Sequence, residues 1–177
     1  MDIPASELYD TSVALLFEGG RRKFTFPVTS NEGERLQRIL DARRGDPCAG
    51  RLFLVFSTLN GWDVAVRVAA VDCLRVLIDP TDIAPVYEPA PECCAHCYFV
   101  GAEEPLDFCP AFPEEAAALV TTLDAETEPP DYRFLSIRDE DAEWLHLALE
   151  RLNLILFSSA LIAAGHQAIR DEVDNPN

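Results

Sequence analysis

Apolar and polar residues alternate along residues 52–68, which is the pattern of two adjacent strands that each bury one face. If residues 59–61 form a three-residue hairpin loop, Phe56 faces Val64 and the two apolar faces coincide. Gly61 suits the left-handed conformation that such a loop needs. A two-residue loop would slip the register and place a polar residue opposite the apolar stripe. With a further short strand after residue 70, the stretch is predicted to be a three-stranded meander.

The same pattern recurs later in the chain. A shift of 81 positions superimposes this meander on residues 133–158 and places Phe53 on Phe134, although few of the matched residues are identical. A hairpin and a helix also precede each meander. We therefore predict an α+β fold, made of a tandem duplication of a ββαβββ unit with two small antiparallel sheets and one helix each, followed by a C-terminal helix.

The first unit is predicted to span residues 12–79. Short apolar runs on both sides of a glycine pair indicate a hairpin over residues 12–28. Asn31 followed by Glu34 indicates the start of a helix, which should end near residues 43–45.

Four prolines between residues 80 and 94 exclude a regular element, so this segment is predicted to link the two units. The second unit then spans residues 95–157, and a helix follows over residues 158–173, where the apolar period changes from two to that of a helix. One long buried helix over residues 140–170 also fits the spacing. The parallel with the first unit favours strands.

The net charge of −17 is unevenly distributed along the chain. Residues 1–80 carry ten Lys and Arg against eleven Asp and Glu, a balance of −1, so residues 81–177 carry the remaining −16. A strongly acidic half repels nucleic acid and anionic membranes. It indicates a solvated surface or a contact surface for a basic partner.

The apolar fraction of 49% is that of a globular protein. No apolar run reaches the roughly 18 residues that a membrane-spanning helix needs, and the acidic N-terminal segment does not have the pattern of a secretion signal. We therefore expect a cytoplasmic protein without a membrane partner.

A cluster of cysteines and one histidine is the best candidate for a metal site. Cys94 and Cys97 have the Cys-x-x-Cys spacing of a zinc knuckle, and Cys109 and His96 could complete it. The second Cys-x-x-Cys of a usual zinc site is missing, and a small buried thiol explains Cys109 equally well. Inert thiols, or a disulfide or redox pair, are the alternatives. Apart from zinc at this cluster, no cofactor is expected.

No catalytic motif is present in the sequence. The three histidines lie in different predicted elements, and no nucleophile is placed beside any of them by spacing. The glycine pair is not followed by a phosphate-binding pattern. We therefore expect a protein that is not an enzyme.

Charged residues at the two hairpin turns are the candidate partner-binding residues. The basic set is Arg21, Arg22, Lys23, Arg43 and Arg44, and the acidic set at the other turn is Glu103 and Glu104. The turns are charge-complementary, so a homodimer is one expectation. Exposed ion pairs contribute only about 0–1 kcal/mol each, so apolar burial would have to supply most of its stability.

Duplication without catalytic residues favours a regulatory or adaptor protein that acts through protein–protein interaction. The alternative is a nucleic-acid-directed protein. It would bind directly through the basic turn, or it would imitate DNA with its acidic half and block a DNA-binding protein.

Overall fold

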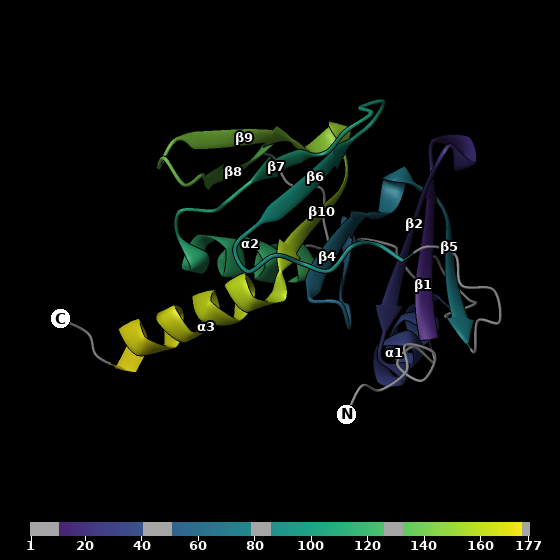
Figure 1. The fold of residues 1–177 in the computed structure, drawn as a ribbon, viewed down its shortest axis with the longest axis horizontal. Coiled ribbons are helices and arrows are strands. Elements are labelled where there is room, and N and C mark those ends of the chain that lie inside the picture. The colour runs from purple at the N-terminus through teal and green to yellow at the C-terminus, as the bar shows by residue number, and fades with distance from the viewer. Residues whose placement is uncertain (1–10, 41–50, 79–85, 126–132, 175–177) are drawn as a thin grey trace.

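The computed structural model describes residues 11–40, 51–78, 86–125 and 133–174 (Figure 1). The first half contains β1 (Thr11–Phe17), β2 (Arg22–Val28), α1 (Ser30–Leu40), β3 (Phe53–Ser57), β4 (Trp62–Arg67) and β5 (Val71–Ile78). The second half contains β6 (Ala95–Phe99), β7 (Leu106–Phe108), α2 (Pro113–Ala125), β8 (Phe134–Arg138), β9 (Trp144–Ala148) and β10 (Leu152–Ser158), followed by α3 (Ser159–Asp174). The described part of the chain is therefore a mixed α+β fold, as predicted.

The order of strands and helices is the same in both halves, and a short 3-10 turn precedes the last strand of each. The alternative of one long helix over residues 140–170 is wrong, because β9 and β10 occupy its first part. The same order of elements does not by itself demonstrate a common origin of the two halves, since short strands and helices recur in many unrelated folds. The tandem duplication therefore stays a prediction.

Three antiparallel sheets are formed by the described strands. Sheet A has the order β2-β1-β5, sheet B has the order β3-β4-β10-β6-β7, and β8 and β9 form a separate hairpin. In Figure 1 sheet A lies on the right with α1 at its lower end, and sheet B runs through the middle. The hairpin β8–β9 and, below it, α2 both lie on the side of sheet B that faces away from sheet A.

The predicted three-stranded meander is wrong in its last strand. After β4 the chain makes a 3-10 turn at Val68–Ala70, and β5 then pairs with β1 rather than with β4. The edge of β4 at which β5 was predicted is paired with β10 of the second half. The expectation of two separate sheets is corrected with it, because sheet B contains strands from both halves.

The hairpin β3–β4 has the predicted register. Phe56 pairs with Val64, and Gly61 has a φ of 89°, the left-handed conformation that only glycine adopts without strain. In the loop, the amide of Thr58 donates to the carbonyl of Trp62 over 2.8 Å. The alternation of apolar residues therefore predicted which face of this hairpin is buried.

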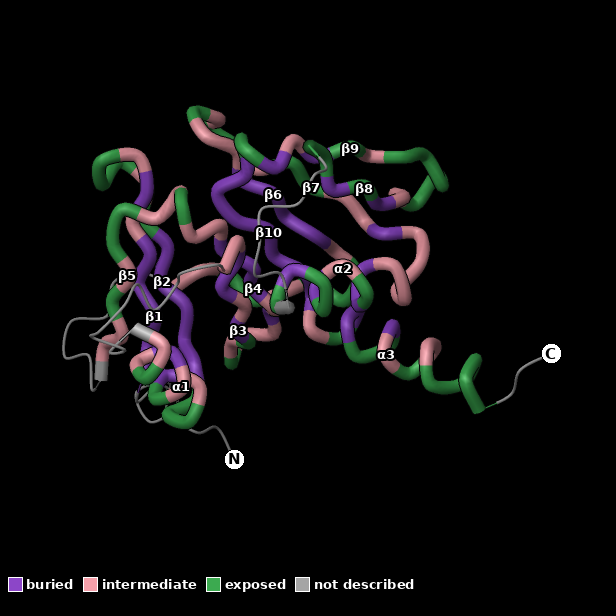
Figure 2. Tube along the Cα trace, turned by 180° about the vertical axis from the view of Figure 1, so that it is seen from behind, coloured by how far each residue is buried: buried purple, intermediate pink, exposed green. Residues whose placement is uncertain are grey.

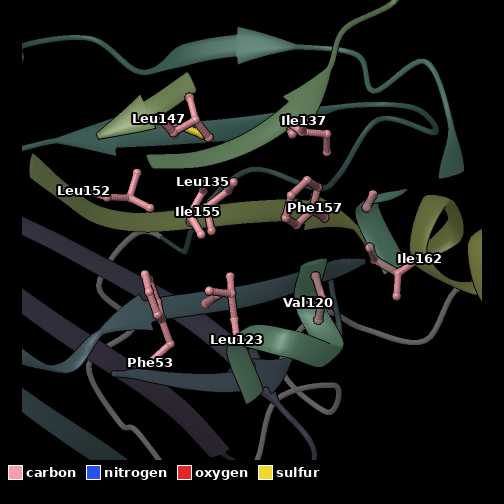
Figure 3. Close-up of a cluster of buried hydrophobic side chains, with 14 of the residues drawn as sticks. Phe53, Val120, Leu123, Leu135, Ile137, Leu147, Leu152, Ile155, Phe157 and Ile162 are labelled. Atoms are coloured by element: carbon pink, nitrogen blue, oxygen red, sulfur yellow. The ribbon is translucent and has the colours of Figure 1, made fainter. Parts of the chain in front are cut away.

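Two clusters of buried side chains lie on opposite faces of sheet B. One fills the space between sheet B and sheet A, and it includes Phe26, Leu54 and Trp62. The other lies between sheet B, the helices α2 and α3 and the hairpin β8–β9, and it includes Phe53 and Leu147 (Figure 3). Each large side chain buried in this way stabilises the fold by about 1.5–3 kcal/mol.

Helix α3 begins where the sequence predicted, because the Ser158 hydroxyl accepts a hydrogen bond from the amide of Leu161 over 3.2 Å. Gly165 brings α3 close to α2: a Cβ atom at this position would lie 2.1 Å from the carbonyl oxygen of Pro113. Beyond this crossing the exposed end of α3 extends away from the core (Figure 2).

The described part of the proline-rich segment, residues 86–94, is irregular and will be called the connector. It is held to both halves. The amide of Tyr87 donates to the carbonyl of Thr25 in β2 over 2.8 Å, and the indole of Trp62 donates to the carbonyl of Glu88 over 2.7 Å. The Ser158 hydroxyl donates to Glu92 over 2.8 Å. The connector is therefore part of the packed structure.

No helix in the described ranges has both the length and the apolar composition needed to cross a bilayer.

Candidate interaction surface

The predicted basic turn is docked on the second half of the same chain. Arg22 donates to the carbonyl of Phe99 over 3.3 Å, and its guanidinium lies 5.5 Å from the ring centroid of Tyr98. Arg21 and Lys23 are exposed. Arg22 is therefore used inside the molecule, and it is not free to bind an external partner.

Glu18 joins the turn between β1 and β2 to the turn between β6 and β7 through hydrogen bonds. Its carboxylate accepts hydrogen bonds from the amide of Gly101 over 2.8 Å and from the side chain of Asn153 over 3.1 Å. The hydrogen bond from Gly101 is the main cause of a lowered pKa of Glu18. The complementary turns thus meet within one chain, which removes part of the reason for expecting them to join two chains.

The remaining predicted partner-binding residues are divided. Glu103 and Glu104 are exposed at the turn between β6 and β7. Arg43 and Arg44 lie outside the described residues, so the structure does not test whether the five basic side chains gather.

The candidate zinc ligands point to different sides of sheet B. Cys94 and His96 lie on the face toward sheet A, whereas Cys97 is buried on the opposite face. Successive residues of a strand face opposite ways, so two cysteines three positions apart in an extended segment lie on opposite faces and cannot both bind one ion. Within the described ranges no three His, Cys, Asp or Glu side chains are grouped closely enough to hold a metal, and this applies to Cys109 as well.

His96 belongs to a hydrogen-bonded group between the two sheets. Its Nδ1 lies 2.7 Å from the Tyr87 hydroxyl, which is 2.6 Å from the hydroxyl of Tyr98. The Cys94 sulfur lies 3.7 Å from Nε2 of His96, but burial raises the pKa of this thiol to about 11. A nucleophilic cysteine needs a lowered pKa, so this group is suited to joining the sheets rather than to covalent chemistry.

The most exposed aromatic residues lie on the outer side of the hairpin β8–β9. Phe134 is 44% exposed and Trp144 is 56% exposed. The ring of His146 stacks on Trp144 with an interplanar angle of 9° and meets Phe134 edge to face. Arg133 lies over Phe134, and Arg138 lies over Trp144. These five residues will be called the outer hairpin face.

The outer hairpin face is supported from behind. The alternate residues Leu135, Ile137 and Leu147 are buried against sheet B (Figure 3). Arg138 is also held by an ion pair with Glu115 of α2, which raises the pKa of the guanidinium. The exposed aromatic rings therefore stand on a packed sheet rather than on a loose loop.

Reasoning from the sequence missed this face, although the signal was present. The matched apolar positions of the second hairpin are Leu135, Ile137, Leu145 and Leu147, and period two then requires Phe134 and the other intervening residues to point outward. The prediction considered only the buried positions, and so it did not use the fact that the outward positions include the aromatic residues Phe134 and Trp144.

The outer hairpin face has the composition of a contact surface. Tryptophan and arginine are enriched among residues that dominate binding energy in protein interfaces, and exposed aromatic clusters are unusual on free surfaces.

Compared with known proteins, the chain matches no family model, no curated protein and no solved structure.

Proposed function

We propose that this protein is a non-catalytic regulator or adaptor that binds another protein through the outer hairpin face. The observation that carries the proposal is the exposure of Trp144 and Phe134 beside two arginines on a hairpin whose other face is buried. About half of each ring is still exposed, so covering it with a partner would contribute a part of the about 1.5–3 kcal/mol that full burial of such a side chain contributes.

The arginines define the kind of partner that fits. Arg133 and Arg138 lie beside the rings in a half of the chain that is otherwise strongly acidic. Arg138 is held by Glu115, but Arg133 is exposed, so a carboxylate of a partner could bind Arg133 while its apolar side chains cover the rings. We therefore propose a partner with a mixed apolar and acidic surface.

The experiment is affinity capture from a native extract with the wild type and with the double variant Phe134→Ser, Trp144→Ser. The matched control is Leu59→Ser, because Leu59 is 45% exposed but lies at the loop of the other hairpin. We expect a captured protein that is lost with the double variant and kept with the control, and that binds again as a purified component. Equal capture by all three chains would contradict the proposal.

Direct binding of nucleic acid is the second candidate, and it is less well supported. Arg22 is committed to contacts within the chain, and the second half is acidic. A gel shift at two salt concentrations tests it, since binding through phosphates weakens steeply with salt. Imitation of DNA by the acidic half predicts no shift, but displacement of DNA from a target protein.

We also propose that the two halves arose by duplication and that the protein is cytoplasmic. The duplication is supported by the equal strand pairing, because β2-β1-β5 and β7-β6-β10 have the same order and each half adds a two-stranded hairpin. The location is supported by free thiols at all five described cysteines, which is usual in a reducing compartment.

A further inference from the structure

Three of the six outer strand edges in the described sheets have hydrogen-bond partners, and the other three are open. The amide of Tyr87 in the connector donates to the carbonyl of Thr25 at the outer edge of β2 over 2.8 Å, and Arg35 donates to the carbonyl of Val55 at the edge of β3 over 2.6 Å. The amide of Ala111 donates to the carbonyl of Arg138 at the edge of β8 over 3.0 Å. Among the described residues, no backbone pairs with the outer edges of β5 and β9. The short β7 is the third open edge.

The pairing of β9 with β8 shows which of its backbone groups point outward. The amide of Leu149 donates to the carbonyl of Arg133 over 3.0 Å. In an antiparallel pair, residues that bond to the neighbour alternate with residues whose N–H and C=O point away. The backbone groups of Trp144, His146 and Ala148 therefore point to the open edge.

The same reasoning applies to β5. The connector donates to the carbonyl of Thr25, so Thr25 and its partner Ala14 do not bond to each other, and the backbone groups of Ala14 point to β5. There Ala14 pairs with Arg75. The neighbouring residues Leu74 and Val76 therefore direct their backbone groups to the open edge.

The pair β4–β10 inside the chain provides the template for joining these edges. In it, Ala65 lies opposite Ile155. Their counterparts 81 positions away are His146 in β9 and Leu74 in β5. His146 and Leu74 both direct unpaired backbone groups outward. The outer edge of β4 is therefore paired with β10, whereas the corresponding edges of β9 and β5 are open.

The faces of the two hairpins show the same difference. Phe53 of the first hairpin is fully buried, because α2 packs on β3 and places Leu123 near it (Figure 3). Its counterpart Phe134 is 44% exposed. The second hairpin is thus open both at its edge and on its outer face, where the first hairpin is covered by the second half.

We infer that β9 of one molecule adds as an antiparallel strand to the outer edge of β5 of a second copy. In the register of the template, His146 lies opposite Leu74 of the second copy, and Trp144 lies opposite its Val76. This proposal goes beyond the proposed function, since the partner is the chain itself. The two edges are different, so the contact is head-to-tail, and assembly continues beyond a dimer unless it closes into a ring.

The association is expected to be weak. β9 has only five residues, and the exposed charged side chains of Asp72 and Arg75 on β5 disfavour edge pairing. Small interfaces of this kind belong to transient complexes. Assembly should therefore depend on protein concentration.

Sedimentation velocity over a concentration series, with the full chain, tests the proposal. His146→Pro removes an outward N–H without removing a bond to β8, and Val76→Pro does the same at β5. The matched controls, His146→Ala and Val76→Ala, keep the N–H groups. We expect the wild type and both alanine variants to assemble at high concentration and each proline variant to remain monomeric. Circular dichroism and thermal unfolding identify a variant that does not fold.

A mixing experiment sharpens the test. His146→Pro leaves β5 open, and Val76→Pro leaves β9 open, so an equimolar mixture should form a one-to-one dimer that grows no further. Assembly that stops at a dimer in the wild type, or a mixture that stays monomeric, would overturn the head-to-tail contact. A wild type that is monomeric at every concentration would overturn the proposal as a whole. None of these outcomes depends on capture of another protein by the outer hairpin face.

Discussion

The hairpins β3–β4 and β8–β9 occupy the same place in the order of elements, but they meet opposite surroundings. Each second strand begins with a tryptophan. Trp62 is fully buried, whereas Trp144 is 56% exposed. The outer edge of β4 is paired with β10, and the outer edge of β9 has no strand partner in the described part of the chain.

Two causes produce this difference: both faces of the first hairpin are covered, whereas one face of the second is open, and the two tryptophans are offset by one residue. In the first hairpin Trp62 shares the inward positions of Val64, while in the second hairpin Trp144 stands next to the inward Leu145. Since side chains of a strand alternate between faces, this offset turns one tryptophan into the core and the other outward. The comparison teaches that hairpins at the same place in the order of elements can be buried in one half and carry an exposed aromatic face in the other.

The largest expected effect separates the two tryptophans. Trp62→Ala should lower the free energy of unfolding by about 3–5 kcal/mol, because it leaves a cavity between the sheets and removes the hydrogen bond to Glu88. Trp144→Ala should change it by less than about 0.5 kcal/mol. Urea unfolding measures both. Similar losses in the two variants would mean that Trp144 is also part of the core.

A smaller effect is expected where the second half has a helix that the first half lacks. Gly165→Ala places a methyl group against Pro113 and Ala117 of α2, so the helices must move apart, at a cost of about 1–3 kcal/mol. Ala164→Val, at an exposed position of α3, is the control. Thermal unfolding should show a clear fall for Gly165→Ala and little change for the control. No fall at Gly165 would mean that the two helices do not cross this closely.

The smallest effect concerns the junction of the two turns. The lowered pKa of Glu18 means that its stabilising contribution is present above its ordinary value of 4.5 and is lost as pH falls through the lowered value in the folded protein. Glu18→Gln should therefore lower the urea midpoint slightly at pH 7, and the difference from the wild type should shrink below about pH 4. Glu104→Gln, at an exposed carboxylate of the facing turn, is the control. A difference that is independent of pH would show that the charge of Glu18 is not involved.

Local features of this protein could be predicted from the sequence because they depend on neighbours along the chain. The alternation around Phe56 and Val64 predicted the strands and their register, Gly61 predicted the loop, and Ser158 predicted the start of α3. Periods of two and 3.6 residues, turn conformations and caps are set within a few residues. The order of elements in both halves followed from these signals.

The choice of strand partners was decided only by the tertiary structure. β5 has a pattern that suits pairing with β4 or with β1, and any exposed edge offers the same backbone donors and acceptors. The choice depends on which arrangement buries most apolar surface over the whole chain.

The period-two rule places Cys97 in β6 on the opposite side from Cys94 just before it, but which elements cover each side is a tertiary outcome. By the same reasoning, the sequence determined that Phe134 and Trp144 share the outward side of their hairpin, whereas only the packing of sheet B decided that nothing described in this chain covers them.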